Sequence, residues 1–435
     1  MKASLDIRSP GFKRYFANTS WLIGQRVLSM IVALFVGIYV ARYLGPEQFG
    51  LLNYAISFVG LFTALATLGL DSIVIRELVK SPECKNKLLG TTFWLKAGGA
   101  ILMWAGIACA IPFSHSDTQT NLLILVIAFA AIFQAFNVID FNYQAAVKSR
   151  YVVYVQMVSL AVSSITKLIF IWISAPLIWF ACVFLIDAVV RAVGLATMYL
   201  INKEKMWQWQ WQWQTAKRLL KDSWPLLLSG MVISIYMKID QVMIKEMLGV
   251  EQVGFYAAAV RLSEAWYFIP MLITSSLFPA IINAKKQSEE RYYQRLQKLY
   301  NLMVWMAVGI ALPTTFLAPW VITFLYGEVF LPSAMVLSIH IWAGVFVFLG
   351  VASGKWYICE NMQKGLFYRT AGGAICNVIL NVIMIPKYGI SGAAISTFIS
   401  QSVAAYFYDA LNHKTRATFW MKTRSFNIFY RVKNV

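Results

Sequence analysis

The chain has 435 residues, of which 59% are hydrophobic and only 13% are charged. Soluble domains carry about a quarter charged residues, so this composition excludes an ordinary soluble protein and indicates one that crosses a membrane many times. The formal net charge of +19 would suggest a nucleic-acid partner in a soluble protein. A membrane protein instead gathers lysine and arginine on its cytoplasmic loops, so no nucleic acid is expected here.

Twelve segments are apolar enough and long enough to cross a bilayer, because a spanning helix needs about 20 mainly apolar residues. We therefore predict an all-α polytopic membrane protein with twelve transmembrane helices. In chain order the predicted spans cover residues 21–44, 51–73, 88–111, 121–142, 151–173, 177–201, 224–248, 253–281, 299–325, 333–354, 366–385 and 389–411.

Basic residues alternate between the loops that join these spans. One set of loops is rich in lysine and arginine, as at Lys203, Lys205 and Lys217, and both chain ends are basic as well. The opposite loops carry few basic residues, and those at 112–120 and 326–332 carry none. Because basic loops stay on the cytoplasmic side, we predict a multi-pass protein with both termini in the cytoplasm.

A repeat divides the chain into halves. Residues 44–50 (LGPEQFG) return as residues 248–254 (LGVEQVG), and each copy lies where one predicted span ends and the next begins. Gly45 and Gly249 are expected to end helices in the left-handed conformation. Six spans per half is an even number, so both halves enter the membrane in the same direction. This predicts two parallel-repeat six-helix lobes around a central cavity.

The predicted boundaries are an N-terminal lobe at 1–206, a cytoplasmic linker at 207–222, a C-terminal lobe at 223–412 and a basic cytoplasmic tail at 413–435. The linker holds a run of alternating Trp and Gln at 207–214. We interpret this run as an interfacial anchor in preference to a carbohydrate or lipid-headgroup platform, because tryptophan favours the headgroup zone. For the tail, a basic amphipathic segment on the inner leaflet and a disordered segment both remain open.

Charged residues stand out inside the predicted spans. The basic ones are Arg26, Lys96, Lys167, Arg191, Lys238 and Arg261, and the acidic ones are Asp187, Asp240 and Glu264. Each central Lys or Arg costs about 2.5–3.5 kcal/mol to insert, so these side chains must face a wet cavity, a partner charge or the headgroups. The positive surplus suits an anionic ligand such as a phosphate-bearing lipid.

Local pairing accounts for some of these charges. Arg26 and Lys96 lie near the cytoplasmic ends of their spans and could reach the headgroups. Asp187 and Arg191 are four residues apart, on one helix face, so they could neutralise each other. The spacing of Arg261 and Glu264 permits the same pairing. Lys238 has no such neighbour and is predicted to face a cavity.

The sequence offers no candidate for catalysis or metal binding. Five cysteines lack metal-type spacing, and three histidines cannot build a metal site or a triad together. We therefore predict no catalytic residue, no metal and no cofactor, and leave coupling to protons or sodium ions open.

Three stretches of this sequence resemble motifs of one known family. In order, they are ARYLGPEQFG at 41–50 with LGLD at 68–71 and RE at 76–77; residues 225–249 with GFY at 254–256; and PKYGISGAA at 386–394. They are similar to the opening, the start of the second lobe and the closing hairpin of bacterial polysaccharide flippases. The chain thus resembles, over nearly its whole length, the Wzx-type O-antigen flippases of the multidrug/oligosaccharidyl-lipid/polysaccharide exporter superfamily.

This resemblance implies a transporter of the bacterial inner membrane. Such proteins move undecaprenyl-pyrophosphate-linked oligosaccharide repeat units from the cytoplasmic to the periplasmic leaflet by ion-coupled alternating access. The glycan would serve O-antigen of lipopolysaccharide or a related surface polysaccharide. A polysaccharide polymerase and a chain-length regulator are candidate partners.

The resemblance also implies a cationic substrate cavity. We assign that role to the charges that fall in the spans: Arg26, Lys167, Arg191, Lys238 and Arg261. The acidic residues Asp187, Asp240 and Glu264 are candidates for ion coupling or for charge pairs.

Two other classes of protein were weighed. A multidrug exporter of the same superfamily would carry acidic groups in the membrane for cationic drugs, whereas bases dominate here. A membrane enzyme of polysaccharide assembly would need catalytic groups on large external loops, and the external loops are short. The sequence also contains no DxD motif and no P-loop, so we predict that the protein is not an enzyme.

Overall fold

Helices make up nearly the whole of the described chain. The computed structural model describes residues 10–114 and 116–427, except the side chains of residues 10–20, 279 and 286. No β-strand occurs among the described residues, which confirms the predicted all-α class. Residues 1–9 and 428–435, on which the predicted cytoplasmic position of both termini depends, lie outside the described part.

The chain divides into two compact units. The first comprises Met1–Tyr43 and Ala55–Ser234, and the second comprises Leu44–Tyr54 and Ile235–Val435. The divisions fall within two long helices, α1 (Pro10–Thr67) and α8 (Trp213–Leu248). The predicted lobe boundaries at residues 206, 222 and 412 stay predictions.

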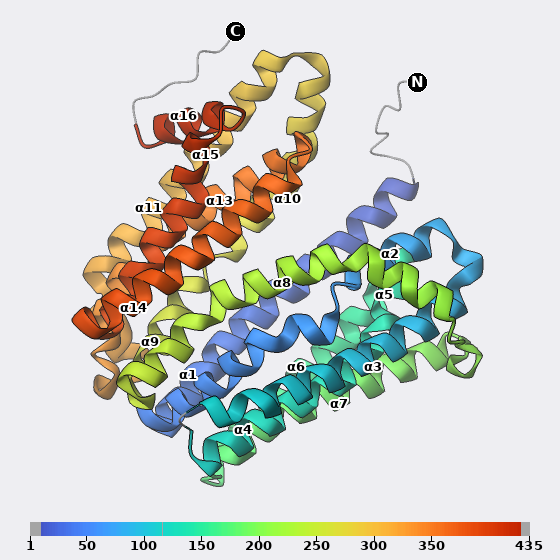
Figure 1. The fold of residues 1–435 in the computed structure, drawn as a ribbon, viewed down its shortest axis with the longest axis horizontal. Helices are drawn as coiled ribbons and strands as arrows, with labels where there is room; N and C mark the ends of the chain where they lie inside the picture. The colour runs from blue at the N-terminus through green and yellow to red at the C-terminus, as the bar shows by residue number, and fades with distance from the viewer. Residues whose placement is uncertain (1–9, 115, 428–435) are drawn as a thin grey trace. The chain divides into compact units, whose positions relative to one another are not determined.

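Each unit is a helical bundle. Besides parts of α1 and α8, the first unit contains α2 (Asp71–Lys80), α3 (Lys85–Ala110), α4 (Thr118–Phe129), a 3-10 segment (Ala130–Asn137), α5 (Val138–Ala145), α6 (Arg150–Trp172) and α7 (Leu177–Ile201). The second unit contains α9 (Val250–Glu264), α10 (Phe268–Gln287), α11 (Glu289–Tyr326), α12 (Ser333–His340), α13 (Ala343–Cys359), α14 (Gln363–Ser402), a π-helical turn (Val403–Phe407), α15 (Tyr408–Leu411) and α16 (Arg416–Ser425). Within the first unit, α6 and α7 pack side by side (Figure 1).

The described chain contains 10 segments that are long and apolar enough to cross a membrane. Two of them, Trp21–Lys80 and Gln363–Leu411, each cover two predicted spans. Glycines with positive φ interrupt these two segments, Gly45 at 67° and Gly389 at 60°, where the sequence predicts a turn. The protein is therefore a multi-pass membrane protein, and the number of twelve spans stays a prediction.

The two copies of the repeated turn share one backbone conformation. Gly45 has φ 67° and ψ 174°, and Gly249 has φ 97° and ψ 173°. The expected left-handed helical cap is therefore not formed, because ψ is extended. A positive φ combined with an extended ψ is a backbone conformation that almost only glycine adopts. The copies also pack against each other inside the second unit: a Cβ added at Gly50 or Gly254 would clash with the backbone of the other copy.

The Trp-Gln run packs partly against the first unit. Trp209 lies against Phe93 and Tyr199, and its indole N–H donates to the Tyr199 hydroxyl at 3.3 Å. Trp207 and Trp211 stay exposed, at 73% and 46%. One indole therefore fixes the run to the bundle and leaves others free for a surface, and the choice between anchor and platform stays open.

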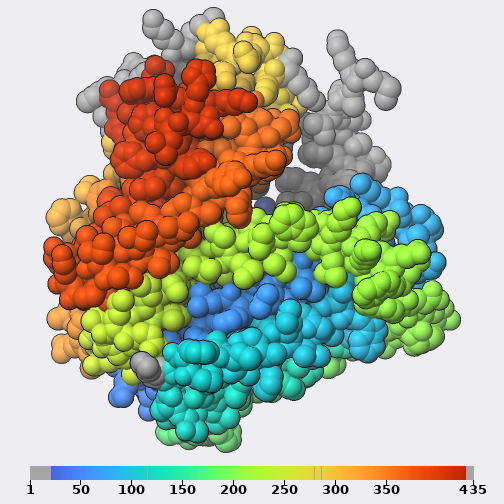
Figure 2. Space-filling view, in the orientation of Figure 1, coloured from blue at the N-terminus to red at the C-terminus, as the bar shows by residue number. Residues whose placement is uncertain are grey.

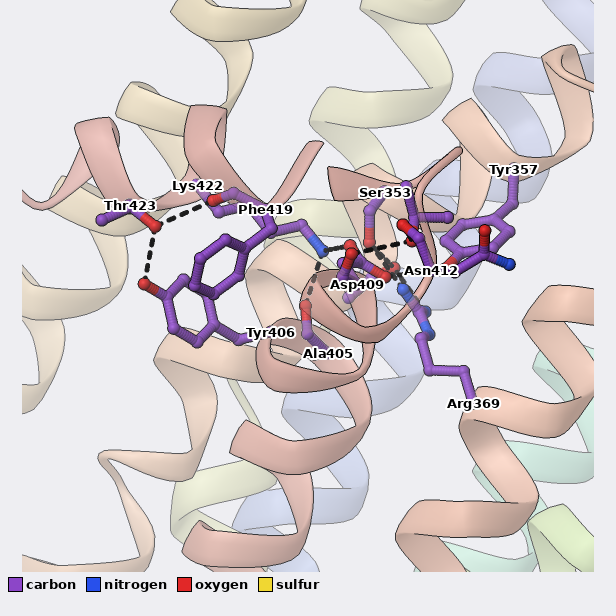
Figure 3. Close-up of polar contacts among 12 residues, drawn as sticks. Ser353, Tyr357, Arg369, Ala405, Tyr406, Asp409, Asn412, Phe419, Lys422 and Thr423 are labelled. Atoms are coloured by element: carbon purple, nitrogen blue, oxygen red, sulfur yellow. Dashed lines mark hydrogen bonds and ion pairs between the residues drawn. The ribbon is translucent and has the colours of Figure 1, made fainter. Parts of the chain in front are cut away.

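The described part of the tail forms a docked helix, and its expected place on the inner leaflet stays a prediction. In α16, the Lys422 ammonium is fully buried and donates to the Asp409 carboxylate at 2.7 Å and to the Ala405 carbonyl at 2.5 Å (Figure 3). The Tyr357 hydroxyl donates to the same carboxylate at 2.7 Å. In the space-filling view, the red C-terminal residues lie against the orange segment of the same unit (Figure 2).

Helix α16 is held in place by contacts with residues of other helices in the second unit. Asp409 and Lys422 lie 13 residues apart. The Gln297 side chain of α11 also donates to the Met421 carbonyl, at 2.9 Å. Such contacts leave no periodic signal in the tail itself, because its partners lie on other helices.

Candidate functional site

A polar cavity lies within the first unit, between α1, α6 and α7. Its volume is about 370 Å³. The lining residues are Gln25, Ser29 and Ala33 from α1; Gln156, Leu160, Ser163 and Lys167 from α6; and Val183, Phe184, Asp187 and Arg191 from α7. These helices read as apolar sequences, so the polar side chains are concentrated on the faces that meet at this cavity.

A second, smaller cavity of about 160 Å³ adjoins the first through shared residues. Phe184, Asp187 and Arg191 line both cavities. The smaller one is otherwise lined by Ala188 of α7 and by residues of α1, α3, α4 and the 3-10 segment, among them Gln134 and Asn137. The ion pair of α7 therefore lies at the junction of two hollows.

The geometry of this junction is set by two hydrogen bonds to one carboxylate. Arg191 donates to Asp187 Oδ2 at 2.7 Å, as their four-residue spacing predicts, and Ser159 donates to Asp187 Oδ1 at 2.5 Å. The Nε of Arg191 is buried and has no hydrogen-bond partner among the described residues. The Arg191 guanidinium therefore has further N–H donors that Asp187 does not occupy.

Lys167 gives the larger cavity its positive surplus. Its ammonium lies 5.9 Å from the centroid of the Phe184 ring. The charged lining residues are Lys167, Arg191 and Asp187, and two positive charges less one negative leave one positive charge in excess. The cavity is suited to a ligand that carries more negative than positive charge.

The other two basic residues that the sequence places in spans of the first unit, Arg26 and Lys96, line neither cavity. Arg26 is exposed. Lys96 is 2% exposed, pairs with Asp71 at 2.8 Å and lies 4.7 Å from the centroid of the Phe141 ring. Asp71 therefore neutralises Lys96. This pairing could not be predicted from sequence spacing, because Asp71 lies 25 residues earlier in the chain.

In the second unit, Asp240 is the centre of a buried polar cluster. Its carboxylate accepts hydrogen bonds from the Tyr256 hydroxyl at 2.8 Å, the Thr397 hydroxyl at 2.6 Å and the Asn381 amide at 2.6 Å. The Asn381 amide also donates to the Asn377 carbonyl oxygen, at 3.3 Å. Asp240 is held by neutral donors from α9 and α14, and none of these contacts involves Lys238.

Two polar atoms of this cluster have no hydrogen bond to described residues: Asn381 Oδ1 and Asn377 Nδ2. Oxygen and nitrogen of an amide exchange places when the side chain flips, so either asparagine could turn an oxygen toward Asp240. A carboxylate, a hydroxyl and amide oxygens form the oxygen-rich donor set that hard cations prefer. A carboxylate in this setting can alternatively hold a proton.

The other charged residues predicted for the second unit are Lys238, Arg261 and Glu264. The Arg261 guanidinium lies 5.7 Å from the centroid of the Phe49 ring, and the described residues show no ion pair between Arg261 and Glu264. Lys238, Asp240 and Arg261 are the charged groups that act electrostatically on Glu264. The structure thus gathers these four charges of α8 and α9 in one unit.

The structure therefore brings Lys167, Asp187 and Arg191 together in one cavity. Sequence reasoning missed the uncharged side chains that complete both sites, such as Gln156 and Asn381. One signal was present: Asn377 and Asn381 are four residues apart in a predicted span, so they share a helix face.

The sequence of this chain is similar to the sequences of known proteins. The family described as "Polysaccharide biosynthesis protein" matches residues 15–285. The "Putative O-antigen transporter" of Shigella flexneri is 25% identical over 398 residues, which cover 87% of this chain and 93% of that protein.

Solved structures share the fold at low sequence identity. "Lipid II flippase MurJ, inward closed conformation" aligns with a TM-score of 0.72 and 17% identity, covering 93% of this chain and 90% of that one. An inward-facing multidrug resistance MATE family transporter of the MOP superfamily aligns with a TM-score of 0.71 and 15% identity, covering 91% and 94%. At these identities the likeness shows the fold alone.

Proposed function

This chain belongs to the polysaccharide biosynthesis protein family, and we propose that it is a flippase for lipid-linked oligosaccharides. The observation that carries the proposal is the cavity in the first unit, where Lys167 and Arg191 face a space of about 370 Å³ inside an apolar helical bundle. Charged side chains at membrane depth are costly, and they are kept where they bind or conduct something.

The proposed substrate is an undecaprenyl-pyrophosphate-linked oligosaccharide repeat unit. The protein would move it from the cytoplasmic to the periplasmic leaflet of the bacterial inner membrane, for O-antigen of lipopolysaccharide or a related surface polysaccharide. Both termini would then lie in the cytoplasm. A polymerase and a chain-length regulator would receive the glycan on the periplasmic side. The name of the Shigella flexneri relative supports this substrate class.

Lys167 and Arg191 would offset the pyrophosphate charge. One N–H of the Arg191 guanidinium bonds Asp187, and the side chain is 42% exposed, so its other terminal N–H groups could donate to a phosphate oxygen. We propose the same electrostatic role for Arg26, Lys238 and Arg261. Asp187 would act as the charge partner of Arg191.

We assign ion coupling to Asp240. A proton or a sodium ion bound there would be held by the Asp240 carboxylate with Asn377, Asn381 and Thr397, whose oxygen donors fit either ion. Glu264 is a second candidate because it shares the electrostatic surroundings of Asp240. Neutralising either carboxylate by its ion would lower the cost of keeping it in the membrane.

The alternative is a multidrug exporter, since MATE transporters share the fold. Cationic drugs would be attracted to acidic groups, whereas the charged lining of the first-unit cavity is positive in sum. A lipid-linked glycan is therefore favoured over a cationic drug as the substrate.

The test is neutralisation of cavity charge in cells that lack the chromosomal copy. Lys167→Gln and Arg191→Gln together should abolish surface polysaccharide at a normal level of membrane protein, and Lys167→Arg should retain part of it. Lys364→Gln, which changes an exposed lysine, is the matched control. Wild-type polysaccharide with both charges neutralised would contradict the cationic-cavity mechanism.

A further inference from the structure

Four carboxamide side chains face the two cavities of the first unit. Gln25 and Gln156 line the larger cavity, and Gln134 and Asn137 line the smaller one. They come from three elements, α1, α6 and the 3-10 segment, in which Gln134 and Asn137 are three residues apart. The Asp187–Arg191 pair lies between them because it lines both cavities.

Three of these carboxamides have their hydrogen-bonding capacity free. Within the described residues, no hydrogen bond is made by the side chains of Gln134, Asn137 or Gln156. Gln25 donates to the Ser29 hydroxyl at 2.9 Å, which leaves its carbonyl oxygen and one N–H unused. None of the four has a fully buried polar atom without a partner, so each faces the open space of its cavity.

Packing does not explain this arrangement. Amides that open onto a cavity add nothing to the packing of an apolar bundle, and leucine or alanine would fill these positions as well. The carboxamides are not needed to solvate the Asp187 carboxylate either, since Arg191 and Ser159 already donate hydrogen bonds to it. The free amides are therefore best explained by a ligand with many hydroxyl groups.

The chemistry of the carboxamide matches a saccharide. Each carboxamide offers two N–H donors and one carbonyl acceptor, and each sugar hydroxyl both donates and accepts, so one amide can bond two adjacent hydroxyls. Phe184, shared by both cavities, presents a ring on which the apolar face of a sugar can pack. The larger volume of about 370 Å³ lies within the range of small-ligand sites.

We propose that Gln25, Gln134, Asn137 and Gln156 read the sugars nearest the pyrophosphate of the lipid-linked glycan. This inference rests on the proposed flippase function and adds the residues that select the glycan. Arg191 and Lys167 hold the pyrophosphate, and the carboxamides on either side of Arg191 bond the adjoining sugar hydroxyls. Changing the amides therefore alters which glycan is accepted and leaves binding of the carrier lipid intact.

The test compares two probes on the purified full-length protein in detergent. One probe is undecaprenyl pyrophosphate, and the other is the lipid-linked oligosaccharide extracted from cells that lack this protein. Wild type should bind the second probe more tightly. Because each uncharged hydrogen bond changes affinity roughly two- to tenfold, the variant Gln134→Met/Asn137→Leu/Gln156→Met should lose at least about tenfold in affinity for the oligosaccharide probe.

The same variant should bind undecaprenyl pyrophosphate as wild type does, which also shows that it is folded. Gln119→Met, at an exposed position outside both cavities, is the matched control and should bind both probes normally. Oligosaccharide released from its lipid should compete at higher concentration if the sugar itself is read. Equal affinity of wild type for both probes, or equal loss of both in the variant, would overturn the inference alone. Failure of wild type to bind either probe would overturn the flippase function as well.

Discussion

Removing the ammonium of Lys422 should release α16 from the second unit. Lys422→Met keeps a long apolar side chain but leaves Asp409 without its cation, in a site where both side chains are 0% exposed. The Tyr357 hydroxyl, at 2.7 Å, then remains as a neutral donor to that carboxylate. Breaking one half of a buried ion pair costs about 3–5 kcal/mol, because the charge that remains is uncompensated.

Hydrogen exchange of the α16 backbone amides measures this cost locally. If α16 opens as a unit, about 3–5 kcal/mol corresponds to exchange faster by roughly a hundred- to several-thousand-fold. The double variant Lys422→Met/Asp409→Leu removes both charges and should recover most of the protection. Lys414→Met, at an exposed lysine just before α16, is the matched control. Wild-type protection in Lys422→Met would refute the reasoning.

Three further predictions concern topology, the linker and coupling. In a cysteine-free background, cysteine at Ser116 should react with an impermeant reagent added from the periplasm and cysteine at Ser288 should not; the opposite pattern would invert the orientation. Replacing the exposed Trp207 and Trp211 with leucine should leave transport nearly intact, whereas a large loss at normal protein level would favour a carbohydrate platform. Asp240→Asn should remove the dependence of transport on a proton or sodium gradient, and unchanged dependence would exclude Asp240 from coupling.

The helical class and the membrane spans could be predicted because they depend on local composition and length. The turns at Gly45 and Gly249 could be located for the same reason, since the repeat marks them. Their contact through Gly50 and Gly254 could not, because it joins segments some 200 residues apart in the chain and leaves no local pattern.

The candidate sites could be predicted only in part. Charge at membrane depth identified Arg191 and Asp240, because a charged residue in an apolar span is conspicuous. The uncharged amides, such as Gln156 and Asn381, cost less to insert and stand out less. Which charges have partners also depended on distant residues: Asp71 neutralises Lys96, and this pairing follows from the packing of α2 against α3.

The most direct test of the flippase function is the leaflet in which lipid-linked oligosaccharide accumulates. Membrane vesicles of defined orientation, prepared from cells with and without the protein, would be treated with a glycan-modifying reagent that does not cross the membrane. Without the protein, the oligosaccharide should be reached only from the cytoplasmic face, and restoring the wild-type chain should make it accessible from the periplasmic face. Equal periplasmic accessibility with and without the protein would contradict the account.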